Sequence, residues 1–208
     1  MDAEGPPLLS VAEAEEPPIS TSGTEEKPLR ADARRNRERL VETARAAFTE
    51  QGEEATLEGI ARVAGVGIGT LYRHFPTREA LIEAVYRAEI ARLRDSAPGL
   101  LEGRSADRAL RAWMDRFIDY FAVKREMADV LHVVVSSGAV SIPQVRAEMA
   151  VAVQVLLDAG VADGTLRGDV AAPDVVAGII GAYLGCGPDQ REQIGRLFDL
   201  LADGLRRN

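Results

Sequence analysis

Four side chains that can donate hydrogen bonds to phosphate lie within one short stretch of the sequence. They are Tyr72, Arg73, His74 and Arg78. The intervening pair Pro76–Thr77 is typical of a helix start, where free backbone N–H groups and the helix dipole also favour a phosphate. Hydroxyl and basic side chains near such a terminus are the usual partners of a nucleic-acid backbone. The cluster therefore predicts a contact with the phosphates of duplex DNA.

The residues before this cluster predict two short helices joined by a tight turn. Residues 57–64 carry apolar side chains at helical spacing, with Thr56 as the candidate N-cap, and a second helix is expected from about Gly67 to His74. Gly65 accepts the left-handed backbone of the turn, and the small Ala61 allows the helices to cross closely. This spacing indicates a helix–turn–helix whose second helix fits a major groove about 12 Å wide.

The second helix has few side chains that could read bases directly. Thr70 could bond a base edge or a phosphate, and Ile68 could contact a thymine methyl group. Gly67 and Gly69 carry no side chain where the backbone would meet the groove. With Gly65 they resemble a dinucleotide-binding loop, but the sixth position is threonine and a helix precedes them, which excludes that interpretation. We expect recognition to depend largely on phosphate register and DNA shape.

A basic arm precedes the first helix of this segment. Arg34 and Arg35 are expected to contact phosphate, whereas Arg39 and Arg45 are interpreted as part of a solvated helix face.

The segment from Ile60 to Tyr86, IARVAGVGIGTLYRHFPTREALIEAVY, resembles the DNA-binding domain of the TetR family of bacterial transcriptional regulators. The resemblance covers about residues 34–93, and it implies an operator-binding homodimer and a variable C-terminal ligand-binding domain. It also implies that Gly67, Ile68 and Gly69 face the groove. By position, the DNA contacts would be made by Thr56, Thr70, Tyr72, His74 and Arg78. Gly59 and Glu58 depart from the usual pattern and leave the contacts of their helix open.

The net charge of −8 is unevenly distributed over the 208 residues. Residues 1–26 hold seven acidic side chains and neither Lys nor Arg, whereas residues 30–78 hold nine Arg against seven acids. Residues 1–30, with five of the ten prolines, are predicted to be a disordered acidic tail. The tail could shield the basic arm or be an inert leader. Whole-chain charge therefore does not argue against DNA binding.

The remaining boundaries follow from apolar periodicity, which is helical almost throughout. We expect an all-α protein with a helix–turn–helix domain at 31–77, a connecting helix at 78–94, and a larger ligand-binding and dimerisation bundle at 95–208. One cysteine and two histidines leave no catalytic constellation, metal site or cofactor site. Neither a membrane span nor a secretory signal is present, so a cytoplasmic location is expected.

The C-terminal bundle is expected to hold a small-molecule effector between its central helices, although an aromatic stripe is also typical of plain core. The candidate pocket residues are Trp113, Phe117, Tyr120, Phe121, Met127, Leu131, Met149 and Val153.

The last two helices are apolar on more than one side, which predicts a four-helix dimer interface, with completion of the monomer core as the alternative. The candidate interface residues are Val176, Ile179, Ile180, Tyr183, Leu197, Phe198 and Leu201.

Together these features predict a ligand-responsive regulator, most simply a repressor, which binds a near-palindromic double-stranded operator as a homodimer. Two alternatives remain open at this stage: an architectural DNA-binding protein without ligand control, and a small helical enzyme.

Overall fold

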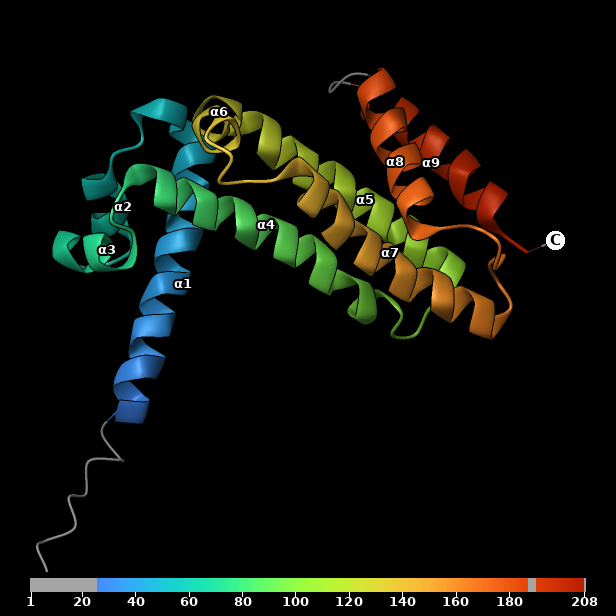
Figure 1. Cartoon of the computed structure of the whole chain (residues 1–208), viewed down its shortest axis with the longest axis horizontal. Coiled ribbons are helices and arrows are strands. Elements are labelled where there is room, and N and C mark those ends of the chain that lie inside the picture. The colour runs from blue at the N-terminus through green and yellow to red at the C-terminus, as the bar shows by residue number, and fades with distance from the viewer. Residues whose placement is uncertain (1–25, 187–189, 208) are drawn as a thin grey trace, which may run out of the picture. The chain divides into compact units, whose positions relative to one another are not determined.

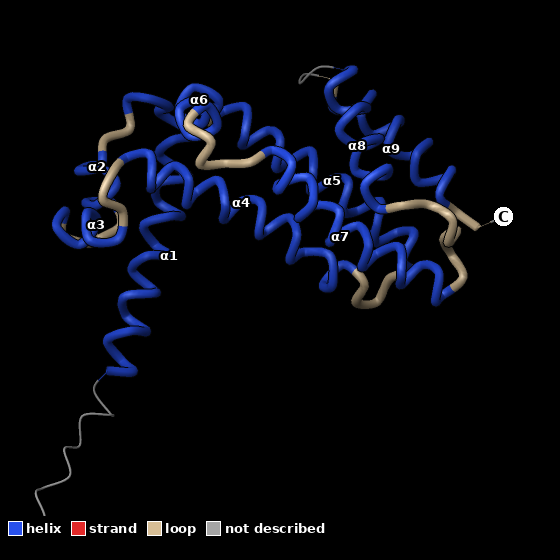
Figure 2. Tube along the Cα trace, viewed as in Figure 1, coloured by secondary structure: helices blue, strands red, loops and turns tan. Residues whose placement is uncertain are grey.

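The computed structural model describes residues 26–186 and 190–207, and this part of the chain is helical without a strand (Figures 1 and 2). The all-α prediction is confirmed. The expected acidic tail falls largely on residues outside those described, and the prediction is wrong for residues 26–30, which belong to α1. The elements are α1 (Glu26–Gln51), a 3-10 helix η1 (Gly52–Glu54), α2 (Leu57–Val63), α3 (Ile68–His74), α4 (Arg78–Leu100), α5 (Ala106–Glu126), α6 (Ala128–Ser136), α7 (Ile142–Asp163), α8 (Ala172–Cys186) and α9 (Arg191–Leu205).

The chain divides into two compact units, residues 1–34 and residues 35–208. The described part of the first unit is the beginning of α1, and the second unit holds the remaining elements. Within the second unit, α1 buries Leu40, Ala44 and Phe48 on one face, the spacing expected of an amphipathic helix. The helix ends where Gly52 adopts a φ of 56°, a conformation that glycine reaches without strain.

The longest helix of the second unit, α4, runs from the helix–turn–helix into the C-terminal bundle (Figure 1). It packs against α5, α6 and α7. Its buried side includes Leu81, Val85 and Ile90, and the indole Nε1 of Trp113 on α5 donates a 3.0 Å hydrogen bond to the carbonyl oxygen of Leu93. One helix therefore connects the helix–turn–helix with the C-terminal helices.

The C-terminal bundle closes with α7, α8 and α9. Leu166, in the loop after α7, lies so close to Gly160 that a Cβ at position 160 would come within 2.4 Å of the leucine side chain. The same loop pairs with the chain end, since Arg167 N donates to Leu205 O at 2.9 Å. No helix in the described ranges is long and apolar enough to cross a membrane.

Candidate nucleic-acid interface

The turn between α2 and α3 has the glycine geometry that its sequence predicts. Gly65 has a φ of 67°, and Val66 N donates to Ala61 O at 3.0 Å, which closes the turn onto the end of α2. Gly67 is then the N-cap of α3. The backbone is thus redirected by local hydrogen bonds, as a helix–turn–helix requires.

Two buried side chains, one in α3 and one directly after it, determine which side of the helix faces outward. Leu71 is fully buried and Phe75, which follows the last turn, is 2% exposed. Beside them, α3 leaves Ile68 37% exposed and Tyr72 45% exposed. An apolar side chain and a phenol that remain this exposed on a two-turn helix are available to a partner surface.

The remaining candidates on or beside α3 have mixed exposure. Gly67, Gly69 and Arg73 are exposed, whereas Thr70 and His74 are half-buried. From Gly67 to Arg78 the sequence contains no Asp or Glu, so the outward side of α3 carries only neutral and basic groups. That charge pattern suits a polyanion.

The exposed Thr56 has a structural role that does not conflict with a phosphate contact. Its Oγ1 accepts a hydrogen bond from the backbone N–H of Gly59 at 3.1 Å, so it is the N-cap of α2 as predicted. The hydroxyl proton remains a donor. A Cβ at Gly59 would come within 3.0 Å of this Oγ1, which gives a steric reason for glycine at that position.

Arg78 is the site candidate whose role the structure changes. Its guanidinium donates to the backbone carbonyl oxygens of Ala55, Glu53 (3.0 Å) and Gly52 (3.4 Å), and it lies over the ring of Phe48. The N–H groups expected to reach phosphate therefore hold the start of α4 against η1 and the residue that follows it. Sequence reasoning missed these contacts, because any residue type carries a main-chain carbonyl. These bonds give Arg78 a positioning role, and its contact with phosphate stays a prediction.

Arg37 of α1 also has a partner that sequence reasoning missed. The Arg37 guanidinium carbon lies 5.1 Å from the centroid of the Phe75 ring, so α1 contacts the residue that caps α3. The aromatic Phe75 at the end of α3 was the sequence feature that could have indicated a cation–π contact with a nearby arginine.

Arg34 and Arg35 are exposed side chains of α1, at the boundary between the two units. Their phosphate contacts stay predictions.

Comparisons with known proteins agree with this geometry. Residues 40–85 match the model of bacterial regulatory proteins of the tetR family, and residues 105–207 match that of the SbtR-like transcriptional regulator C-terminal domain. A TetR transcriptional regulator from Streptomyces coelicolor has a crystal structure with 50% sequence identity and a TM-score of 0.71, covering 83% of this chain and 99% of that one. The chain belongs to the TetR family.

Other relatives support the assignment over different lengths. A TetR regulatory protein from Mycobacterium vanbaalenii is 34% identical, with a TM-score of 0.67, over 86% of this chain and 100% of its own. Curated HTH-type transcriptional regulators of Staphylococcus aureus are 40% identical over 63 residues, which is 30% of this chain and 34% of theirs. The match thus spans about a third of the length of those curated relatives. TetR-family regulators are DNA-binding proteins and not enzymes, so the enzyme alternative is set aside.

The residues predicted to form an effector pocket lie in the core of this TetR-family bundle. Seven of them are buried and Phe121 is half-buried. The aromatic ones pack against one another in tilted contacts, as Phe117 and Phe121 do at 4.7 Å between ring centroids. The buried seven are Trp113, Phe117, Tyr120, Met127, Leu131, Met149 and Val153. A role in ligand binding stays a prediction, and their packed positions agree with the alternative of plain core.

The Tyr120 hydroxyl donates to the Tyr86 hydroxyl at 3.0 Å, which joins α5 to α4 inside the bundle. Burial raises the pKa of Tyr120 far above its usual value, with the neighbouring Tyr86 adding to the effect. Tyr120 is therefore neutral, and its hydroxyl makes a buried hydrogen bond to Tyr86.

The predicted dimer residues divide into two groups. Val176, Ile179, Tyr183 and Phe198 are buried within the chain itself, so they attach α8 and α9 to the rest of the bundle. Ile180, Leu197 and Leu201 are half-buried. Sequence reasoning missed Leu184, 65% exposed, and Leu200, 68% exposed, which are the large apolar side chains that α8 and α9 leave uncovered.

Proposed function

We propose that this TetR-family protein is a homodimeric repressor that binds a near-palindromic operator and is released by a small-molecule effector. The observation that supports the proposal best is the outward side of α3, where Ile68, Tyr72 and Arg73 are exposed in a stretch, residues 67–78, that contains no Asp or Glu. Such a surface would enter a major groove and be held by phosphates on both sides.

Dimerisation is supported by the uncovered apolar surface of α8 and α9. Leu184 and Leu200 are the most exposed leucines of these helices, with Ile180, Leu197 and Leu201 partly accessible. Burial of such a surface against a symmetry mate would remove it from water. A two-fold dimer would then present two α3 helices to half-sites about 34–36 Å apart.

Effector control is supported by the continuity of α4. The helix begins at Arg78, which holds the segment after α1, and it pairs through Arg94 with Glu148 of α7 at 3.3 Å. A displacement of α7 would therefore be transmitted toward α3. A coupling of about 1–3 kcal/mol would change operator affinity about 5–150-fold.

Selection of bound duplexes from a random pool, with the full chain as bait, tests the proposal. We expect enrichment of sequences with two inverted half-sites, and footprinting of both halves. An asymmetric single half-site, or no enrichment at low salt, would contradict it. Binding that no metabolite affects would favour the architectural alternative.

A further inference from the structure

A groove between α7 and α8 lies outside the helix–turn–helix and is lined by other residues than the predicted effector pocket. Its volume is about 430 Å³, within the range of small-molecule sites. The groove is lined by Ile142, Pro143, Arg146, Ala147 and Ala150 of α7 and by Pro173, Val176 and Ala177 of α8. Seven of these side chains are apolar, and Arg146 is the single charged one.

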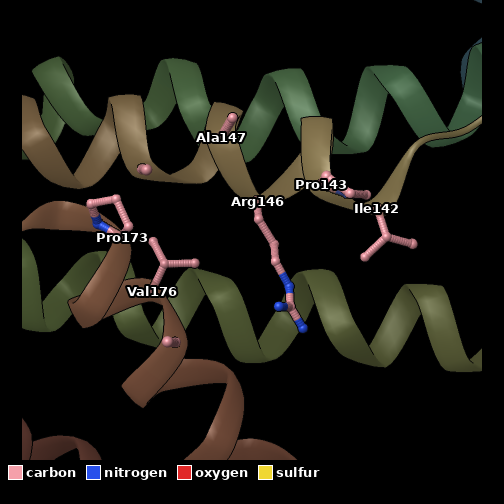
Figure 3. Close-up of a pocket in the computed structure, with 8 residues that line it drawn as sticks. Ile142, Pro143, Arg146, Ala147, Pro173 and Val176 are labelled. Atoms are coloured by element: carbon pink, nitrogen blue, oxygen red, sulfur yellow. The ribbon is translucent and has the colours of Figure 1, made fainter.

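Arg146 is directed along this groove. In Figure 3 its side chain leaves α7 on the same side as Ile142, and Pro173 and Val176 of α8 lie across from it. No described residue forms a hydrogen bond or an ion pair with its guanidinium. Glu148, two residues away, is paired with Arg94 instead. The groove therefore contains an uncompensated cation with five N–H donors above apolar walls.

We propose that the effector of this protein is a small amphipathic anion, a carboxylate on an apolar chain or ring, which binds in the α7–α8 groove with its charge on Arg146. The role of this anion as an effector rests on the proposed function, whereas the binding of the anion in the groove does not. A carboxylate matches the planar guanidinium in two parallel hydrogen bonds, and the apolar part would cover Pro143, Ala147, Pro173 and Val176.

A second copy of the chain fits this groove less well. An apolar partner surface would bury the Arg146 charge without compensation, which is costly. The uncovered leucines that suit a symmetry mate are Leu184 and Leu200, and neither lines the groove.

The position of the groove also suggests how an occupant would act. Arg146 and Ala147 directly precede Glu148, whose contact with Arg94 joins α7 to α4. An anion that draws Arg146 toward α8 would shift this turn of α7, and α4 would carry the shift to the helix–turn–helix.

Calorimetric titration of the full chain with three probes of equal chain length tests the site without DNA. The probes are decanoate, decanol and decyltrimethylammonium. We expect decanoate to bind about 10–100-fold more tightly than decanol, and the cation to bind most weakly. Equal affinity for decanoate and decanol, or no binding of decanoate, would overturn the proposal.

Variants assign the binding to the groove. Arg146→Ala should weaken decanoate about 10–100-fold and leave decanol unchanged, and Arg146→Lys should recover part of the loss. Ala147→Trp, at an exposed lining position, should weaken both probes by filling the groove. Arg104→Ala removes an exposed arginine between α4 and α5 and is the matched control. Decanoate binding that survives both groove variants would overturn the assignment, as would a dimer that dissociates in Arg146→Ala.

A DNA arm separates this inference from the proposed function. Decanoate should lower affinity for the selected duplex about 5–150-fold, and Arg146→Ala should abolish that effect. Decanoate that binds through Arg146 without affecting DNA would contradict its role as an effector. A chain that selects no duplex would contradict the proposed function, while the calorimetric result would still decide the chemistry of the groove.

Discussion

The guanidinium group of Arg78, the first residue of α4, lies 5.1 Å from the centroid of the Phe48 ring in α1. The same group donates to carbonyl oxygens of the segment between α1 and α2. One side chain thus joins the start of α4 to α1 and to the segment that leads into α2. We expect the orientation of α3 to depend on this junction as well as on its own residues.

Replacement of Arg78 by Ala should therefore lower the stability of the fold. We expect a loss of about 1–3 kcal/mol in the free energy of unfolding, because backbone carbonyls lose a charged donor. Urea unfolding measures this loss. Arg73→Ala, at an exposed position of α3, is the matched variant: it should leave stability unchanged and reduce the slope of log affinity against log salt by about 1. A salt slope altered by Arg78→Ala and not by Arg73→Ala would reverse the two assignments.

Thr70 and Tyr72 should differ in how they affect specificity. Tyr72→Phe removes one hydroxyl donor and should weaken the selected duplex and random DNA alike, by about 2–10-fold. Thr70→Ala should weaken the selected duplex more than random DNA. Fluorescence anisotropy with both duplexes measures the two ratios, and equal losses for Thr70→Ala would place Thr70 on the backbone.

Dimer formation should depend on the leucines that α8 and α9 leave exposed. Leu184→Glu and Leu200→Glu should each shift the sedimentation equilibrium toward monomer, because the interface would bury an unpaired carboxylate. Val133→Glu, at a 45% exposed position of α6, is the control and should leave the equilibrium unchanged. Dimers that persist in both leucine variants would place the interface elsewhere.

Gly160 should tolerate no side chain. A Cβ there would meet Leu166 at 2.4–2.6 Å, so Gly160→Ala must displace the loop that also anchors the chain end, at a cost of about 1–3 kcal/mol. Gly99→Ala, where nothing lies within 4 Å, should instead stabilise α4 by up to about 1 kcal/mol. Thermal unfolding of the two variants should therefore shift in opposite directions.

Acid should weaken the start of α5 through Asp163. The Thr165 hydroxyl, with the backbone N–H groups of Ala106 and Thr165, lowers the pKa of this carboxyl below its usual value. A lowered folded pKa gives stability that is present above the unfolded value of about 3.9 and is lost as pH falls through the folded one. Asp163→Asn should lower the Tm at pH 7. Between pH 5 and 3 the Tm of this variant should fall less than that of the unchanged protein.

The matched change for this comparison is Asp158→Asn on the same helix, whose carboxylate accepts from the exposed Gln154 side chain. An Asp163→Asn profile parallel to that of the unchanged protein would contradict the assignment.

The helix–turn–helix could be predicted because its signals are local. Thr56 and Thr77 cap α2 and α4 through bonds to the third residue onward, and Gly65 makes the turn, all within a few residues of sequence. The role of Arg78 could not be predicted, because its partners lie 23–26 residues earlier and are carbonyls. Periodicity likewise indicated that Trp113 and Phe117 face inward, but it does not distinguish a side chain packed in the core from one that lines a cavity. The α7–α8 groove depends on the distance between two helices, which no residue pattern encodes.

Trp113 is the single tryptophan of the sequence, and its indole proton bonds α5 to the Leu93 carbonyl of α4. Any near-ultraviolet emission excited at the red edge of absorption therefore comes from one fully buried ring of α5, which is hydrogen-bonded to α4, the helix that runs from the helix–turn–helix into the bundle. Trp113 is thus an intrinsic fluorescent probe of the contact between α4 and α5. A change in its emission wavelength or lifetime would report loosening of this contact without an added label.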